Sequence, residues 1–380
     1  MEQLKTPVVI MRAGTSKGIF IKEENLPKNQ EERNQLILKI FGSPDIRQID
    51  GLGGADPLTS KLAIIGPSTR EDADVDYTFG QVSYVASKID YSGNCGNISS
   101  GVAPFAVDEG LVKVEEPYTT VRVHNTNTGK ILVEKVQVMG GKTQVTGDYA
   151  IAGVPGTGAE ISIDFSDTAG AATGKLLPTG NVVDKIEVEG YGEIEASLVD
   201  AANPVVFVRA KDLKLTGIET PSQIDENKEL LKTLEEIRGK GAQMMGLVDN
   251  WEEAVKVAPA FPMIAFVSPA QDYKDFTTGK DIKTEDVDFV SRLMFMQVVH
   301  KTYAGTATIC TGAAARIKGT IVNEAMEDKG QESVLRIGHP AGVITIDVAA
   351  HEKDGQWALE KAAISRTARR IMDGNCYTVK

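Results

Sequence analysis

Cysteine is scarce in this chain of 380 residues, and its three copies lie far apart, at Cys95, Cys310 and Cys376. An odd and sparse set of this kind argues against a disulfide framework and indicates a reducing compartment. The four histidines are equally scattered, and no two cysteines have the spacing of zinc ligands. We therefore expect no metal site and no bound cofactor.

Long apolar runs and basic stripes are also missing. No run reaches the roughly 18 apolar residues that a membrane-spanning helix needs. Met1–Lys5 leads directly into a strand-like run instead of a secretory signal. A net charge of −12 without a basic stripe speaks against a nucleic-acid-binding protein. We expect a cytoplasmic protein with neither membrane nor nucleic acid as a partner.

The negative charge also constrains the substrate, because it would repel an anion at long range. An acidic substrate would have to be held by local donors, such as Arg12, Lys17, Lys61 and helix N-termini. The length suits two domains. We expect an N-terminal domain over 1–182, to which 370–380 could return, and a C-terminal domain over 183–369.

What the chain has in abundance is glycine, 37 residues, and the most informative segment, Gly93–Ser100, is rich in it. Cys95 stands there between asparagines and glycines, ahead of a small apolar helix-like stretch over 98–107. Backbone N–H groups at a helix start attract a carboxylate and favour an ionised thiol. The segment predicts a catalytic thiol beside a bound acid, or else a structural cysteine behind an Asn94 helix cap. Pro104 is at odds with one long helix.

The predicted elements fall into two similar series. The first has strands over 7–11, 19–21, 58–65, 75–85, 119–124, 130–138 and 161–165 and a helix over 29–41. The second has strands over 205–208, 264–267, 332–337 and 343–348 and helices over 229–238, 286–299 and 305–316. The turn Asp50–Pro57 ahead of the Lys61 strand is matched by Asp200–Pro204 ahead of 205–208. Two such halves, each with a helix N-terminus at one cleft, would hold a substrate with two carboxylates.

Two further motifs each allow a functional and a structural interpretation. Gly14–Gly18 matches the G-x-S-x-G pattern, but strands on both sides argue against a hydrolase elbow. It predicts a turn whose hydroxyls and Lys17 face an anion, or a plain hairpin turn. Lys61 begins an apolar strand, where a buried neutral amine could act as a base or the side chain could point outward. Cys310 is expected to be core, and His300 and His339 could each reach a carboxylate.

Several segments together resemble one family, and the resemblance covers essentially the whole chain. They are 11–18, 48–51, 59–61, 93–97 and 124–130. The family contains methylitaconate Δ-isomerase, 2-methylaconitate isomerase and 4-oxalomesaconate tautomerase, and it is called PrpF-like. The stretches 56–69 and 300–306 most resemble 3-methylitaconate Δ-isomerase. The resemblance implies an α+β, diaminopimelate-epimerase-like fold of two pseudo-symmetric domains, each a rolled sheet around a central helix.

The resemblance also implies site residues. In the epimerases each central helix begins at a cysteine, whereas the second helix here begins Gly305-Thr306-Ala307, which excludes a two-thiol mechanism unless Cys310 moves in. The family's catalytic pair matches Lys61 and Cys95, with the base left open between them. The substrate-binding residues that we expect are Thr15, Ser16, Lys17, Gly53, Gly54, Asn94, Gly96, Asn97, Gly305, Thr306 and His339.

The implied activity is a cofactor-independent 1,3-proton shift that moves a C=C bond in a branched unsaturated di- or tricarboxylate. The favoured reaction is 3-methylitaconate to 2,3-dimethylmaleate. Isomerisation of 2-methylaconitate or tautomerisation of 4-oxalomesaconate are the alternatives within the family. Outside it, a cofactor-independent racemase or a passive carboxylate-binding protein stay open. We also expect a homo-oligomer.

Overall fold

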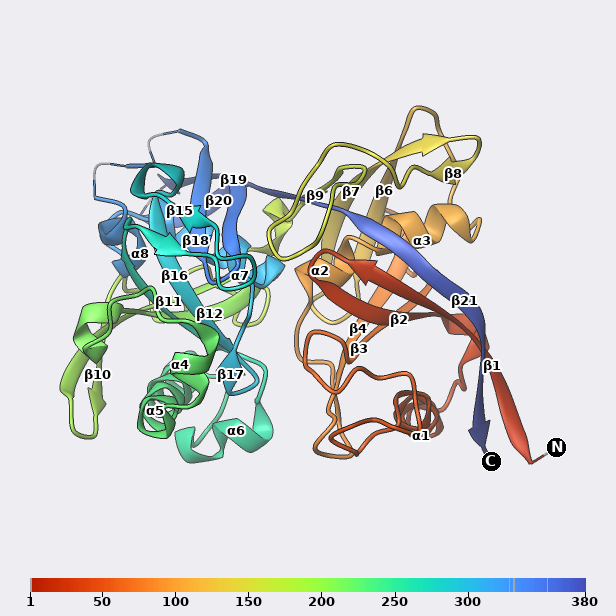
Figure 1. Ribbon diagram of the computed structural model, residues 1–380, viewed down its shortest axis with the longest axis horizontal. Coiled ribbons are helices and arrows are strands. Elements are labelled where there is room, and N and C mark those ends of the chain that lie inside the picture. The colour runs from red at the N-terminus through yellow and green to blue at the C-terminus, as the bar shows by residue number, and fades with distance from the viewer. Residues whose placement is uncertain (1, 328, 331, 354) are drawn as a thin grey trace. The chain divides into compact units, whose positions relative to one another are not determined.

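The chain forms two compact units in a computed structural model, which describes residues 2–327, 329–330, 332–353 and 355–380 (Figure 1). Unit 1 consists of the residues up to Ile163 together with Ser365–Lys380, and unit 2 is Asp164–Ile364. Unit 2 is therefore inserted into unit 1 along the chain. No helix in the described ranges is both long and apolar enough to span a bilayer.

The first division of the chain lies earlier than the expected boundary at 182/183, because the segment 164–182 is bonded to unit 2. The Asp200 carboxylate accepts hydrogen bonds from the backbone N–H groups of Ala172 and Thr173. Ser197 Oγ donates to the carbonyl oxygen of Val182. The second division falls at 364/365, a few residues before the expected return at 370.

Unit 1 is built mainly of strands. Its elements are β1 (Gln3–Ala13), β2 (Ser16–Lys22), η1 (Glu23–Asn25), α1 (Gln30–Phe41), β3 (Lys61–Pro67), β4 (Val75–Val82), β5 (Ile89–Asp90), α2 (Gly96–Ser99), α3 (Val102–Asp108), β6 (Tyr118–Asn125), β7 (Lys130–Met139), β8 (Lys142–Thr143) and β21 (Ala368–Val379). Two strands, β9 (Ile161–Asp164) and β20 (Gln356–Arg366), cross the divisions of the chain.

The strands of unit 1 pair in a fixed succession. β1–β2 is antiparallel, β2–β3 parallel, β3–β4 antiparallel, β4–β6 parallel and β6–β7 antiparallel. At its other edge β1 pairs with β21 over its whole length, from Gln3 opposite Val379 to Ala13 opposite Ala368 (Figure 1). The last strand of the chain thus lies beside the first.

Helices cover both faces of the unit 1 sheet, because successive residues of a strand point to opposite faces. On β2, Ile19 and Ile21 belong to a core cluster with the α1 side chains. Phe20 points to the other face, where its ring lies 5.8 Å from that of Phe105 of α3. The predicted helix 29–41 is confirmed as α1, which begins after the Asn29 cap and ends at Gly42 in the left-handed conformation.

The predicted helix over 98–107 is in fact two helices, α2 and α3, separated at Ser100 and Gly101. Pro104 lies in the first turn of α3, where a missing backbone N–H costs nothing. Gly101 is where the chain must pass close to the sheet, since a Cβ there would lie 2.6 Å from the ring of Phe20. The break therefore lets α2 and α3 both pack on β2.

Unit 2 has more helices than unit 1. Its elements are η2 (Ser166–Thr168), β10 (Asp184–Val188), β11 (Gly192–Ala201), β12 (Asn203–Arg209), η3 (Ala210–Leu213), α4 (Pro221–Asp225), α5 (Lys228–Met244), η4 (Trp251–Glu253), α6 (Ala254–Val257), β13 (Met263–Pro269), β14 (Tyr273–Lys274), β15 (Asp281–Ile282), η5 (Thr284–Asp286), β16 (Phe289–Phe295), β17 (Val298–Val299), α7 (Gly305–Arg316), α8 (Ile321–Ala325), β18 (Val334–His339) and β19 (Gly342–Lys353).

The pairing succession of unit 1 recurs in unit 2. β11–β12 is antiparallel, β12–β13 parallel, β13–β16 antiparallel, β16–β18 parallel and β18–β19 antiparallel. The helix between the two parallel strands is α1 in unit 1 and α5 in unit 2, and the helices before the next parallel pair are α2–α3 and α7–α8. Helix α7 is buried along almost its whole length. The predicted α+β fold of two pseudo-symmetric halves around central helices is thus confirmed.

The predicted internal match of the halves is wrong in one detail. The Lys61 strand, β3, corresponds to β13, which begins at Met263, and not to 205–208. Asp200–Pro204 corresponds instead to the first hairpin turn of unit 1, because it joins β11 to β12 as Arg12–Gly18 joins β1 to β2. The sequence-based match was misled because Asp50–Pro57 and Asp200–Pro204 both begin with Asp and end with Pro.

The predicted helix 286–299 is also wrong, because this segment forms β16 and β17. Every residue of Phe289–Phe295 is buried. A strand covered on both faces shows no alternation, so its apolar run resembles a buried helix. The hairpin turns at Met296 and Gln297, both with positive φ.

Candidate active site

Lys61 is the first residue of β3 and is buried, with 3% of its surface exposed. Its Nζ donates to Gln81 Oε1 at 2.9 Å and lies 5.4 Å from the ring centre of Phe79. Gln81 in turn donates to the carbonyl oxygens of Pro57 and Ser60, which fixes the amide with its oxygen toward the amine. The inward orientation, one of the two sequence-based alternatives, is the one that the structure shows.

Cys95 is the N-cap residue of α2, and 8% of its surface is exposed. Its Sγ accepts from the backbone N–H of Ile98 at 3.5 Å. The predicted cap, Asn94, instead accepts from the N–H of Cys95 at 2.7 Å and from Ser99 Oγ. The Cys95 Sγ thus lies at the N-terminal end of α2 with one backbone N–H directed at it.

Lys61 and Cys95 face the same side of the sheet. Tyr77, Phe79 and Gln81 are alternate residues of β4, so their side chains project from one face, about 7 Å from one to the next. Lys61 contacts the last two. Tyr77 lies near the thiol: burial raises its pKa well above the usual value, and the charge of Cys95 raises it further. The amine thus lies over Phe79 and Gln81, and the thiol lies near Tyr77, on the same face of β4.

The hairpin turn between β1 and β2 joins this cluster through Asn97. Asn97 Nδ2 donates to Thr15 Oγ1 at 3.1 Å, and its Oδ1 accepts from the N–H of Thr15. Ser16 follows; its Oγ is buried and has no hydrogen-bond partner among the residues that the structure describes. Gly14–Gly18 is therefore a hairpin turn between strands, as predicted, and presents hydroxyl groups beside α2.

Other predicted binding residues have different surroundings. Lys17 points away from α2, because Ser16 and Gly18 occupy the α2 face of β2. Gly53 and Gly54 pack against side chains: a Cβ would lie 2.2 Å from Gln48 at the first and 2.2 Å from Thr59 at the second. Their lack of a side chain is thus explained by loop packing ahead of Lys61. Gly96 is the first residue of α2 and is buried.

Arg366 joins the cluster from the far end of the chain. It is 3% exposed, and its Nε donates to Asn97 Oδ1 at 3.2 Å. Burial lowers the pKa of Arg366 to about 10, an effect that the charges of Tyr149 and Cys95 oppose. No local motif pointed to Arg366, because only the β1–β21 pairing brings it to the hairpin turn.

A buried carboxyl group, that of Glu134, lies beside the start of α3. Glu134 of β7 is fully buried, and its Oε2 accepts from the N–H of Ala103 at 3.0 Å, in the first turn of α3. Burial raises the pKa of Glu134 to about 8. The carboxyl group takes the place of a capping side chain, since the N-cap residue of α3 is Gly101.

Unit 2 has neither a lysine nor a cysteine at the positions that match Lys61 and Cys95. Met263 begins β13 where Lys61 begins β3, and Ala304 is the N-cap of α7 where Cys95 is that of α2. Thr306 is the second residue of α7, as Asn97 is of α2, and its Oγ1 accepts from Asn203 in the matching hairpin turn at 2.8 Å. The two halves thus share a framework and differ in chemistry.

The remaining predicted groups of unit 2 are buried. Cys310 donates from Sγ to the carbonyl oxygen of Val199 at 3.2 Å, and burial raises its pKa. It is core, as predicted. His339 is 1% exposed, ends β18 and accepts at Nδ1 from the N–H of Ala341. Gly305 is the first residue of α7, which has no capping side chain. In the described ranges no three His, Cys, Asp or Glu side chains converge as a metal site would require.

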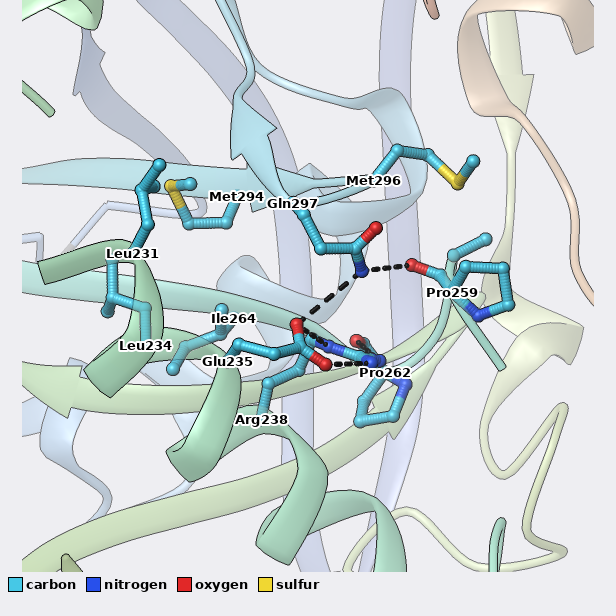
Figure 2. Close-up of a pocket in the computed structure, with 11 residues that line it drawn as sticks. Leu231, Leu234, Glu235, Arg238, Pro259, Pro262, Ile264, Met294, Met296 and Gln297 are labelled. Carbon is cyan, nitrogen blue, oxygen red and sulfur yellow. Dashed lines mark hydrogen bonds and ion pairs between the residues drawn. The ribbon is translucent and has the colours of Figure 1, made fainter. Parts of the chain in front are cut away.

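A crevice beside α5 in unit 2 is shown in Figure 2. Arg238 makes two hydrogen bonds to the Glu235 carboxylate, at 2.6 and 2.8 Å, and also donates to the carbonyl oxygens of Ala258 and Pro262. Gln297 donates to Pro259 O and to Glu235. These bonds tie α5 to neighbouring loops, so the crevice is structural.

Comparisons with known proteins show the family to which the chain belongs. The family model described as PrpF protein matches residues 3–379. The chain is 62% identical to "3-methylitaconate isomerase" of Eubacterium barkeri over 379 residues, which cover 100% of this chain and 98% of that protein. The crystal structure of a methylitaconate-delta-isomerase matches with a TM-score of 0.82 and 62% identity, covering 100% of this chain and 97% of the other.

A more distant neighbour supports the fold alone. A hydroxyproline epimerase from Agrobacterium vitis matches with a TM-score of 0.61 at 13% identity, covering 99% of this chain and 92% of the other. The family match, by contrast, extends over nearly the whole chain. The chain belongs to the PrpF protein family.

Proposed function

We propose that this protein is a cofactor-independent isomerase that interconverts 3-methylitaconate and 2,3-dimethylmaleate. Lys61 and Cys95 are the proton-transfer pair. The observation that carries the proposal is that both groups lie against one face of β4, while unit 2 has Met263 and Ala304 at the matching positions. The 62% identity to a protein named 3-methylitaconate isomerase supports the choice of substrate.

The reaction needs one proton removed and one returned. One member of the Lys61–Cys95 pair takes the proton from C3, which is allylic and adjacent to a carboxylate. The electron pair left behind forms the new C2=C3 double bond, and the electrons of the exocyclic C=CH₂ bond take up a proton at the methylene carbon. The product has the same atoms, with a methyl group where the methylene was. Fixed donors around the carboxylates stabilise the dienolate between the two steps.

The experiment that tests the proposal is proton NMR of the purified protein in D₂O. Separate samples hold 3-methylitaconate, 2-methylaconitate and 4-oxalomesaconate. We expect double-bond migration with deuterium uptake for 3-methylitaconate. Activity on only one of the other two substrates would keep the isomerase and change its substrate, whereas deuterium exchange at C3 without migration would indicate a racemase. No change in any sample would overturn the proposal.

Cys95→Ala tests the assignment of the thiol. We expect it to lower turnover of 3-methylitaconate by about 10²–10⁴-fold, the usual contribution of a positioned acid or base. Cys310→Ala is the matched control, because it removes a second buried thiol from a helix that lies in the other unit. Equal turnover in both variants would remove Cys95 from the mechanism.

A further inference from the structure

Arg366 is a buried cation without a carboxylate partner among the described residues. Its Nε donates to Asn97 Oδ1 and its Nη1 to the carbonyl oxygen of Ser365, at 3.2 and 2.8 Å. Its Nη2 is buried and has no hydrogen-bond partner in the described part of the chain. A guanidinium held in the interior by neutral groups alone is costly, because it loses its water without gaining an opposite charge.

Two other arginines of unit 1 have an ion-pair partner or greater exposure. Arg370 lies four residues further along the same end of the chain and forms ion pairs with Glu109 and Asp373. Arg12 donates to two carbonyl oxygens and is only half-buried. Arg366 therefore stands out as a buried guanidinium with an unused donor and no counter-charge among the described groups.

The unused donor lies within the candidate site. Asn97, which Arg366 contacts, also binds Thr15, and the next residue, Ser16, has a buried hydroxyl without a partner in the described ranges. Cys95 lies two residues before Asn97 and is close enough for its charge to affect the guanidinium. Two unsatisfied donors, from Arg366 and Ser16, thus flank one amide beside the reactive thiol.

From this arrangement we propose that Arg366 binds a carboxylate of the substrate, through Nη2 and with the help of Ser16 Oγ. This inference rests on the function proposed above. The planar guanidinium is suited to a carboxylate and carries its charge at neutral pH. The carboxylate held there is the one on the carbon that loses its proton, since its charge grows in the dienolate and a fixed cation beside it stabilises that charge.

Binding of an unreactive analogue tests the inference separately from catalysis. The probes are 2,3-dimethylsuccinate, the saturated counterpart of substrate and product, and its monoamide, which lacks one charge. By titration calorimetry we expect the wild-type protein to prefer the dicarboxylate by tenfold or more. In Arg366→Gln this preference should fall to about twofold or less. An Arg366→Gln variant that keeps the wild-type preference would overturn the inference.

Two further variants separate binding from folding. Arg370→Gln removes a cation nearby in the sequence and should keep the wild-type preference for the dicarboxylate. Arg366→Lys keeps the charge without the planar fork and should recover part of the preference, together with part of kcat. If Arg366→Gln does not fold but Arg366→Lys does, loss of preference in Arg366→Lys with an unchanged melting temperature supports the inference, and an unchanged preference opposes it.

The outcomes also separate this inference from the proposed function. A wild-type protein that isomerises 3-methylitaconate while Arg366→Gln keeps its preference would leave the function standing and remove Arg366. A wild-type protein that isomerises none of the three substrates, yet binds 2,3-dimethylsuccinate in an Arg366-dependent way, would keep the carboxylate site and remove the function.

Discussion

At the scale of single residues, the candidate site depends on side chains that the fold holds away from water. Lys61 has an amide oxygen and an aromatic ring as neighbours, and Cys95 has a backbone N–H. Groups in such surroundings are oriented before the substrate arrives, so little reorganisation is needed during the reaction. Replacing either side chain should therefore have a measurable effect on kcat.

Lys61→Met reproduces in unit 1 the residue found at the matching position of unit 2. The length of the side chain is kept, so we expect a melting temperature close to that of the wild-type protein and a kcat lower by about 10²–10⁴-fold. Steady-state kinetics with 3-methylitaconate measures the effect. Lys39→Met, on α1, is the control and should retain activity. Near-normal kcat in Lys61→Met would show that the amine takes no part in proton transfer.

Glu134 makes stability depend on pH. Its pKa is raised to about 8 in the folded protein by burial, above the ordinary value of 4.5. The folded state therefore holds more protons than the unfolded state between these values, and the free energy of unfolding falls as pH rises through this window. The difference amounts to a few kcal/mol, on the order of 1.4 per pH unit.

Glu134→Gln removes this titration while keeping the shape of the protonated acid. Urea denaturation at pH 5, 7 and 8.5 should show a smaller fall in stability than in the wild-type protein, with the largest gain at pH 8.5. Glu109→Gln is the control: Arg370 and Lys22 lower the pKa of Glu109 below its ordinary 4.5, so its loss should change stability by the same amount at all three pH values. Parallel pH profiles for the wild-type protein and Glu134→Gln would contradict the prediction.

At the scale of elements, the distance between α2 and the sheet sets the separation of thiol and amine. Gly18 of β2 lies between Ile98 of α2 and the backbone of Lys61. A Cβ on Gly18 would lie 2.8 Å from Ile98 and 2.9 Å from the carbonyl oxygen of Lys61. Ile98 can rotate, but the β3 backbone cannot move without disturbing the ladder. An added methyl group therefore moves α2, β3 or both.

Gly18→Ala should lower the free energy of unfolding by about 1–3 kcal/mol, the usual cost of overpacking. Because the strain falls between the two reactive groups, kcat should fall more than tenfold even where the variant is fully folded. Chemical denaturation and steady-state kinetics measure the two effects. Gly374→Ala, on β21, where a Cβ would meet only Met372 Cε at 3.6 Å, an ordinary contact, is the control and should change neither. Unchanged kcat in folded Gly18→Ala would show that this spacing is not critical.

The elements also show what can be predicted from sequence. Helix α1 has an amphipathic pattern with a cap at each end, and the sequence predicts it closely. Strand β16 is covered on both faces and carries no pattern that separates it from a helix. The glycines and asparagines around Cys95 form a motif that can be read from the sequence, whereas no sequence motif surrounds Arg366. Its role follows from a strand pairing between opposite ends of the chain.

At the scale of the whole molecule, a net charge of −12 opposes a substrate that carries two negative charges. Added salt screens this long-range repulsion more than it weakens contacts inside a buried site. We expect kcat/KM for 3-methylitaconate to rise by about two- to fivefold between 10 and 200 mM KCl, with kcat nearly constant. A fall in kcat/KM over this range would show that local cations, rather than the net charge, govern capture.

The insertion of unit 2 into unit 1 has a consequence for biosynthesis. The strand that closes unit 1 along β1, and the arginine beside the hairpin turn, leave the ribosome only after all of unit 2 has been made. Until then β1 keeps one edge unpaired, in a state prone to wrong pairing with other chains. The emerging chain therefore contains Lys61 and Cys95 long before Arg366 has been made.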